Sequence, residues 1–183
     1  MSHFSLLLVT DQQPDDNDIE RLLAPYYESE SNEQPKWDWY SRGGRWTGAL
    51  DADYDVEKDQ RNIETCDLCR GTGMRNDNLG RSARVKDPAY TCNGCEGKGK
   101  RLKWPTQWAD FPGDQVMVKD LKPNTNIDFF AYLIDGQWIE RGDMGWFGEV
   151  RDEKSKDKWL QEQKNIHASL KPEQWLTVID CHI

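Results

Sequence analysis

The sequence contains no hydrophobic run long enough to span a membrane. A membrane helix requires about eighteen or more consecutive apolar residues, and the most apolar stretch, FSLLLV at residues 4–9, is far shorter. This stretch also lacks the basic flank that precedes the apolar core of a secretory signal. We therefore expect a soluble protein of the cytoplasm with no membrane partner.

Motifs that mark the common catalytic sites are absent as well. The chain has no phosphate-binding P-loop, no G-x-S-x-G nucleophile, no H-E-x-x-H pattern and no pair of carboxylates placed by a motif. His3 begins a predicted strand and His167 lies inside a predicted helix, and neither has a second ligand at metal spacing. The sequence therefore predicts a protein that is not an enzyme.

Large aromatic residues compensate for a low apolar content. Hydrophobic residues make up only 36% of the 183-residue chain and charged residues 31%, but the chain has nine Trp, six Tyr and five Phe. Because each aromatic side chain buries a large area, this composition predicts a folded chain instead of a disordered one. The length fits one domain, alone or with an added module.

The two ends of the chain carry the pattern of one α+β domain. Strands are predicted where apolar runs end in turn residues, helices where acidic caps precede an apolar stripe, and a hairpin where Asp135-Gly136 separates two strand-like runs. The predicted elements are a strand at 3–10, a helix from 16 to about 25, strands at 129–134 and 137–141, a helix at 152–170 and a strand at 175–183. This order predicts a ferredoxin-like βαββαβ body made of residues 1–64 and 105–183, with residues 65–104 as an insertion.

Two side-chain placements follow from these elements. The helix at 152–170 should bury one apolar face, and the closing strand carries the adjacent residues Cys181 and His182. Because neighbouring strand residues point to opposite faces, one of that pair should be buried and the other exposed. The expected helix face consists of Trp159, Leu160, Ile166 and Leu170.

The middle of the chain contains the same motif twice. Residues 66–73 read CDLCRGTG and residues 92–99 read CNGCEGKG, and both are C-x-x-C-x-G-x-G. Two C-x-x-C pairs at this separation are typical of a tetrahedral Zn²⁺ site, with glycines that let the backbone approach the thiolates. A redox C-x-x-C pair is the alternative, but redox motifs normally occur singly beside a helix. The expected ligands of one Zn²⁺ per chain are Cys66, Cys69, Cys92 and Cys95.

These repeats resemble the zinc-binding, cysteine-rich module of the DnaJ (Hsp40) chaperones, in which two C-x-x-C-x-G-x-G repeats hold each zinc ion. Only two repeats are present, enough for one ion, and the chain has no His-Pro-Asp tripeptide of a J-domain. The half-module is also similar to that of the tryptophan-attenuation antagonist anti-TRAP, where it supports protein–protein contact. The flanking segments GGRWTG, GDMGWFG and VIDCHI look like those of a group of bacteriophage proteins. The resemblance implies a phage accessory protein that acts in the host cytoplasm.

Charge is distributed unevenly along the chain. The formal net charge is −9, yet residues 66–104 contain nine basic and four acidic residues, so this part carries +5 and the remainder −14. A basic segment can bind the phosphates of nucleic acid, but few aromatics interleave these basic residues and the acidic remainder would repel a polyanion. Nucleic-acid binding is therefore an alternative that the charge disfavours.

An aromatic and arginine-rich segment, WDWYSRGGRWTG at residues 37–48, precedes the cysteines. Two arginines around a glycine pair could form an aromatic-walled pocket for an anion. The aromatics could equally form an ordinary core, with the arginines paired to Asp38 or Asp51. The candidate anion-binding residues are Arg42, Gly43, Gly44, Arg45 and Trp46.

The metal module and the acidic body together lead us to expect a non-catalytic accessory protein that binds or inhibits a host or phage protein. A rigid metal-held loop presents a defined surface at low entropic cost. Two other functions stay open: nucleic-acid binding, and the binding, sequestration or turnover of a small anionic ligand by the aromatic segment.

Overall fold

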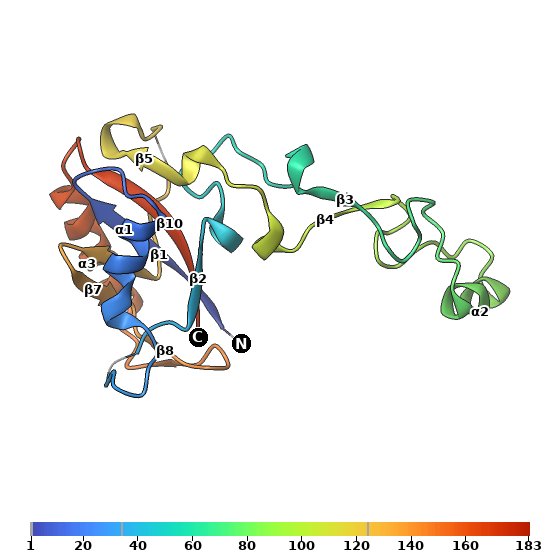
Figure 1. The fold of residues 1–183 in the computed structure, drawn as a ribbon, viewed down its shortest axis with the longest axis horizontal. Helices are drawn as coiled ribbons and strands as arrows, with labels where there is room; N and C mark the ends of the chain where they lie inside the picture. Colours follow the sequence, from blue (N-terminus) through green and yellow to red (C-terminus); the bar gives the residue numbers. More distant parts are fainter. Residues whose placement is uncertain (1, 34, 124) are drawn as a thin grey trace. The chain divides into compact units, whose positions relative to one another are not determined.

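The computed structural model describes residues 2–33, 35–123 and 125–183. The chain divides into two compact units: unit 1 comprises Met1–Tyr54 and Asp110–Ile183, and unit 2 comprises Asp55–Ala109 (Figure 1). Unit 2 begins and ends outside the expected insertion at 65–104. The reason is that the strands on either side of the cysteine repeats pair with each other and so belong to the inserted unit.

A mixed sheet forms the centre of unit 1, in the order β2-β10-β1-β6-β7, with β5 also paired to β10 (Figure 1). Strand β10 runs antiparallel to β1, β2 and β5, whereas β1 and β6 are parallel. Strands β8 and β9 form a separate hairpin. The strands are β1 His3–Thr10, β2 Trp39–Arg42, β5 Gln115–Met117, β6 Ala131–Ile134, β7 Gln137–Glu140, β8 Asp143–Met144, β9 Val150–Arg151 and β10 Trp175–His182.

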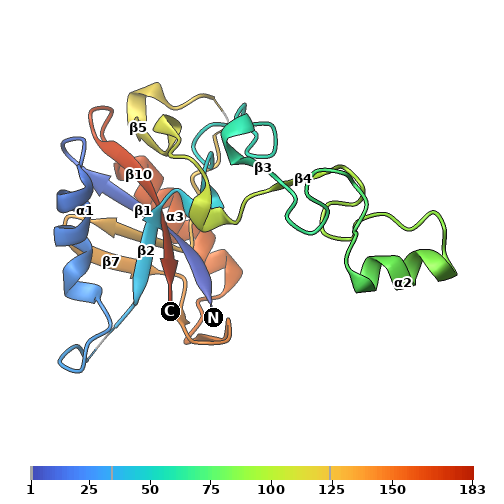
Figure 2. The ribbon, with the colours of Figure 1, turned by 45° about the vertical axis from the view of Figure 1, so that its right-hand side comes forward.

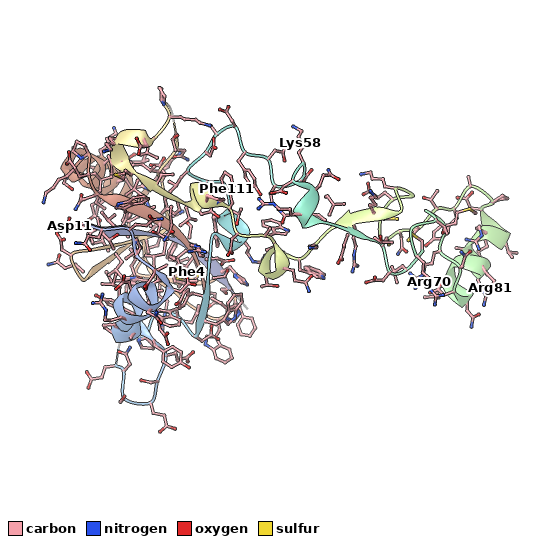
Figure 3. All side chains as sticks on the ribbon, turned by 45° about the horizontal axis from the view of Figure 1, so that its top comes forward. Phe4, Asp11, Lys58, Arg70, Arg81 and Phe111 are labelled. Carbon is pink, nitrogen blue, oxygen red and sulfur yellow. The ribbon has the colours of Figure 1, made fainter. Side chains whose placement is uncertain are left out.

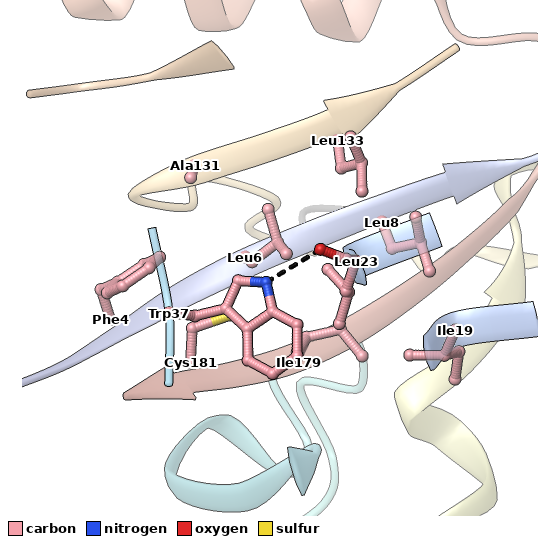
Figure 4. Packing of buried hydrophobic residues seen from close by; sticks show 10 residues of the cluster. All are labelled: Phe4, Leu6, Leu8, Ile19, Leu23, Trp37, Ala131, Leu133, Ile179 and Cys181. Carbon is pink, nitrogen blue, oxygen red and sulfur yellow. Dashed lines mark hydrogen bonds between the residues drawn. The ribbon is translucent and has the colours of Figure 1, made fainter. Parts of the chain in front are cut away.

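Strand β1 is buried on both faces, which explains its continuous apolar sequence. Leu6 and Leu8 belong to a cluster that includes the buried residues of α1 (Asp16–Leu23), shown in Figure 4. Leu7 belongs to a second cluster, which includes the buried apolar residues Trp159 and Ile166 of α3 (Lys156–Ser169). Unit 1 therefore has three layers, with one helix on each face of the sheet (Figure 2).

The α+β class is confirmed, but the ferredoxin-like topology is not. In the split βαβ pattern of that fold another strand separates the two strands that the first helix connects, whereas β1 and β6 are direct parallel neighbours here. The two helices also cover opposite faces of the sheet instead of the same face. The physical reason lies in β1, since a strand that is apolar on both sides needs a cover on both sides.

The last strand corrects a second expectation. Cys181 and His182 point to opposite faces as predicted, but both are buried. Cys181 lies in the cluster beneath α1, and His182 lies on the other face, against His3 and Trp39. Alternation along a strand predicts exposure of one residue only when one face of the sheet is open, and β10 has no open face here.

The predicted turn between β6 and β7 is confirmed, but the helix starts differ from those expected: Asp15, just before the expected acids, caps α1, and α3 begins at Lys156 instead of at residue 152. Asp135 and Gly136 connect β6 to β7 with φ angles of 50° and 72°, the pair of left-handed residues that a two-residue hairpin turn requires. Asp15 caps α1 and Ser155 caps α3, each by accepting a backbone N–H three residues later. Short 3-10 helices complete unit 1 at Ala24–Tyr26, Gly44–Trp46, Pro112–Asp114 and Val118–Asp120.

Helix α3 buries a partly polar face. Trp159 and Ile166 are buried as expected, but Leu160 is exposed and Gln163 takes the remaining buried position. The Gln163 amide donates to the Tyr132 hydroxyl at 3.2 Å, which offsets the cost of burying it. In the part of the chain that the structure describes, no helix has the length and apolar character of a membrane span.

Unit 2 has little regular structure. Its elements are the 3-10 helix Gln60–Asn62, β3 Ile63–Thr65, α2 Asn78–Lys86, β4 Lys100–Leu102 and the 3-10 helix Pro105–Gln107. Strands β3 and β4 pair antiparallel at the base of the cysteine repeats. All residues of this unit are described, and the only hydrophobic side chains buried among them are those of the four motif cysteines. The cysteine cluster is therefore the core of unit 2.

Candidate metal centre

The four cysteines of unit 2 converge in one buried cluster. All four Sγ atoms lie within 4.8 Å of one another. The Sγ atoms of Cys66 and Cys92 are 3.8 Å apart, and those of Cys69 and Cys95 are 3.6 Å apart. A tetrahedral ion with bonds of about 2.3 Å to sulfur spaces its ligands by about 3.8 Å. The donor set and its spacing therefore fit a metal ion at the centre.

The chemistry of this cluster is that of a closed site. The sulfurs of the two close pairs are too far apart for disulfides, which need about 2.0 Å. Four sulfur donors fill a tetrahedral ion completely, whereas catalytic zinc sites keep one position for water or substrate. The arrangement can hold an ion and crosslink two chain segments, and it provides no coordination position for a reactant.

The two repeats hold each other by reciprocal hydrogen bonds. The N–H of Cys66 donates to the carbonyl of Gly99, and the N–H of Cys92 donates to the carbonyl of Gly73, both at 2.9 Å. Each bond joins the first cysteine of one repeat to the last glycine of the other. The duplicated sequence therefore produces a duplicated backbone contact around the sulfurs.

The glycines of the motif are required by close backbone approach. Gly73 and Gly99 have φ angles of 73° and 74°. A side chain at Gly73 would collide with the carbonyl of Gly97, and one at Gly99 with the carbonyl of Gly71. The N–H of Gly99 also donates to Sγ of Cys95 at 3.2 Å. The expectation that glycines bring backbone donors to the thiolates is thus confirmed at this position.

The cysteines differ in how easily they lose a proton before any metal binds. Burial opposes ionisation of Cys69, but hydrogen bonds from Gly73, Cys95 and Gly71 lower its pKa to about 7. Burial raises the pKa of Cys95 to about 11, with the N–H of Gly99 acting in the opposite direction. A metal that takes four thiolates at neutral pH must therefore displace protons from this cluster.

No model of a known protein family matches the chain, and comparisons with curated proteins and with solved structures find no match either. The likeness to DnaJ-type zinc modules therefore rests on the repeated motif, and the sulfur geometry supports a metal site independently of that likeness.

The segment predicted to bind an anion wraps two carboxylates of the protein itself. The N–H of Arg45 donates to Asp180 at 2.9 Å, and the N–H of Gly48 donates to Asp114 at 2.7 Å. Both carboxylates are buried. These backbone donors thus serve internal acids in unit 1.

The close passage of this segment over the two buried carboxylates also explains its glycine pair. Gly43 and Gly44 have φ angles of 66° and 54°. A side chain at Gly43 would collide with Asp114, and one at Gly44 would collide with Asp180. The pair therefore allows the chain to pass closely over two buried acids.

The two arginines of this segment have different surroundings. Arg42 pairs with Asp16 at 3.4 Å and with Asp110 at 3.2 Å, instead of the two acids expected from the sequence. The Arg45 side chain is exposed, and Trp46 packs on the cluster beneath α3. Binding of an external anion by the two arginines stays a prediction.

Two histidine–carboxylate pairs lie at one end of the sheet and were not predicted from the sequence. Nδ1 of His3 lies 2.8 Å from Asp180, and Nδ1 of His182 lies 2.6 Å from Asp38. The two rings are 4.9 Å apart because the residues face each other across β1 and β10. Only the strand register brings them together, and no spacing along the sequence indicates it.

Proposed function

We propose that the protein is a non-catalytic, zinc-binding adaptor whose unit 2 binds another protein. The observation that carries this proposal is the composition of unit 2, in which the four cysteines are the only buried hydrophobic side chains while larger apolar side chains are exposed. A surface of this kind favours protein contact, because isolated apolar residues gain free energy when a partner covers them. The exposed apolar residues are Leu68, Met74, Leu79, Val85 and Trp104.

Zn²⁺ is the ion that the donor set favours. Four thiolates in a closed tetrahedron are typical of structural zinc sites, and soft sulfur ligands disfavour Mg²⁺ and Ca²⁺. Cys66, Cys69, Cys92 and Cys95 would hold one ion. When bound, the ion supplies the crosslink that a unit without an apolar core otherwise lacks.

The basic residues of unit 2 argue against nucleic acid as the partner. Arg75 binds Asp77 and Asn93, and Arg101 binds Glu64 and Asp67. Residues 55–109 contain eleven basic and eight acidic residues, so a centre of four thiolates and one Zn²⁺ brings the unit close to neutrality. Arg81 of α2, labelled in Figure 3, donates to the backbone carbonyl of Asn76 and to the side chain of Asn78.

The partner we propose is a protein of the host cell. Support comes from the resemblance of the flanking segments to bacteriophage proteins and of the half-module to a protein-binding one. The acidic charge outside residues 66–104 gives unit 1 little attraction for nucleic acid and leaves a basic or apolar protein surface as the better match.

The test is the capture of a binding partner by two kinds of variant. One kind removes a metal ligand, and the other removes exposed apolar side chains of α2. Leu79→Ser with Val85→Ser removes two exposed apolar side chains of α2, and Leu160→Ser is the matched change on the exposed side of α3 in unit 1. We expect a host protein captured by the wild type to be lost with the α2 variant and with Cys69→Ser but kept with Leu160→Ser. Equal capture by all four proteins, confirmed by calorimetry with the purified partner, would refute a role for unit 2.

A further inference from the structure

A cavity of about 480 Å³ opens beside α1 and β2 in unit 1. Its volume lies in the range of small-molecule sites. Aromatic rings form most of its wall, and its charged residues are acids. The lining residues that matter are Glu20, Tyr27, Trp37, Asp38, Trp39 and Tyr40.

The aromatic wall is held rigidly. The ring of Trp37 is buried, and its indole N–H donates to the carbonyl of Leu23 at 3.0 Å, drawn in Figure 4. The Tyr27 ring meets Trp37 edge to face at 5.0 Å, and the Tyr40 ring meets it at 5.2 Å with an interplanar angle of 84°. Three rings at steep angles thus adjoin one cavity.

The outer ring is fixed by the backbone. The segments around Tyr27 and Trp37 are joined by hydrogen bonds from Glu28 N–H to the Trp37 carbonyl at 2.7 Å and from Lys36 N–H to the Tyr26 carbonyl at 2.8 Å. Tyr27 is nevertheless 45% exposed. A ring that is anchored by its backbone and open to solvent is available to a ligand.

The electrostatics of the cavity favour positive charge. Glu20 and Asp38 are the charged residues among the described residues that line it. Burial, and then the negative charges of Glu20 and Asp16, raise the pKa of Tyr40. The cations close to these residues in sequence are engaged by other acids: Arg21 by Asp18, Lys36 by Glu140 and Asp143, and Arg42 by Asp16 and Asp110.

We propose that this cavity binds an organic cation, namely an alkylammonium group. Aromatic faces attract such cations through their quadrupole, and the Glu20 carboxylate adds direct attraction, whereas Asp38 is already paired with His182. An inorganic ion is a poor match, because the four cysteines are the one group of possible metal ligands within bonding reach among the described residues. This cavity is separate from the anion site predicted around Arg42 and Arg45, since neither arginine lines it.

The decisive experiment is a titration of the full chain followed by the indole N–H signals in nuclear magnetic resonance. Tetramethylammonium chloride should shift the signals of Trp37 and Trp39 with saturation. Sodium chloride at the same ionic strength and sodium phosphate should not. Shifts that fail to saturate, or that appear equally with sodium, would overturn the proposal.

Matched variants identify the groups responsible. Tyr27→Leu should weaken tetramethylammonium binding about two- to fivefold, whereas Tyr27→Phe keeps the ring face and should bind as the wild type does. Glu20→Gln should weaken binding, and Glu173→Gln, an equal change at an exposed acid outside the lining residues, should not. Binding that ignores both Tyr27→Leu and Glu20→Gln would place the cation elsewhere and refute the site.

Two sources of the cation share this chemistry, and separate titrations distinguish them. Choline represents a free amine, and a short peptide with one trimethyllysine represents a side chain of another protein. Saturable binding of either probe, reduced by Tyr27→Leu, supports the site and names its source. If neither probe binds, the proposal fails. Because Tyr27 lies in unit 1, the outcome is independent of the metal-dependent contact proposed for unit 2.

Discussion

Two buried carboxylates of unit 1, Asp114 and Asp180, differ in how their charge is balanced. Asp180 pairs with His3 at 2.8 Å. Asp114 receives hydrogen bonds from Gly48 and Thr47, but burial outweighs them and raises its pKa to about 6. At neutral pH this carboxyl is ionised, but burial makes its ionisation more costly in the folded state than in water.

This carboxylate predicts a specific pH dependence. An unfolded aspartate titrates near pH 3.9, so between about pH 4 and 6 the folded state retains a proton that the unfolded chain has lost. The contribution of Asp114 to stability is therefore highest below about pH 4, falls through this window and stays low above it.

Asp114→Asn removes the titrating carboxyl group and therefore the pH-dependent loss of stability that it causes. The asparagine side chain keeps an oxygen acceptor for the N–H of Gly48. The free energy of unfolding of this variant, relative to the wild type, should rise by about 2–3 kcal/mol from pH 4 to pH 7. Urea denaturation followed by tryptophan fluorescence measures the difference, since seven of the nine tryptophans lie in unit 1. A constant difference across this pH range would contradict the prediction.

The glycine pair over these acids allows a second test at the residue scale. Gly44→Ala places an alanine in the left-handed region, which costs about 1–2 kcal/mol of conformational energy. The added Cβ would also collide with Asp180 and Ser41. Gly136→Ala adds the same backbone strain at φ 72° with no atom within 4 Å of the new carbon. Gly44→Ala should therefore destabilise the protein clearly more than Gly136→Ala in thermal melting. Equal losses of thermal stability in the two variants would contradict this prediction and show that the segment shifts to accommodate the added Cβ.

At the scale of elements, we expect α2 and the two repeats to depend on a bound metal ion, because they have no apolar core. We expect one zinc per chain by elemental analysis. Removal of zinc by a chelator should collapse the amide signals of residues 66–103 and leave those of the unit 1 sheet in place.

Single cysteine changes provide the matched control for that experiment. Cys69→Ser should lose zinc and the ordered repeats. Cys181→Ser alters a buried cysteine of unit 1 and should keep the full zinc content. Loss of the unit 1 signals on chelation would mean that the two units unfold together and would contradict the prediction.

Features that depend on residues close together in the sequence could be predicted. Features that depend on contacts between segments far apart in the sequence could not. The Asp135-Gly136 turn and the cysteine repeats depend on residues close in sequence, and both were found at their predicted places. The position of β6 beside β1 depends on pairing between segments more than 100 residues apart, and the ferredoxin-like topology predicted from the order of the elements is not confirmed. The pairing of His3 with Asp180 depends on register between residues at opposite ends of the chain.

For the whole molecule, the junction between the units is a feature of unit 1. The rings of Tyr54 and Phe111 stack at 3.7 Å with an interplanar angle of 17°, at the two positions where the chain leaves and re-enters this unit. The ends of the inserted segment are therefore brought together by unit 1 itself.

Replacement of residues 55–109 by a short glycine and serine linker should leave unit 1 folded. Its clusters on both faces of the sheet involve no residue of unit 2. The shortened protein should melt cooperatively, and zinc or chelator should not change its melting temperature. A shortened protein that lacks near-ultraviolet circular dichroism would show that unit 1 needs the insertion.

The place of β10 in the sheet has a consequence for synthesis on the ribosome. This strand lies between β1 and β2 and also pairs with β5, yet every one of those partners is translated before it. At about 5–20 residues per second, the stretch from the end of unit 2 to β10 takes several seconds to make. Throughout that time β1 is without its antiparallel neighbour, while both cysteine repeats, which could together hold a metal ion, have already been translated. Unit 2 can thus fold before unit 1, although unit 1 supplies the chain on both sides of it.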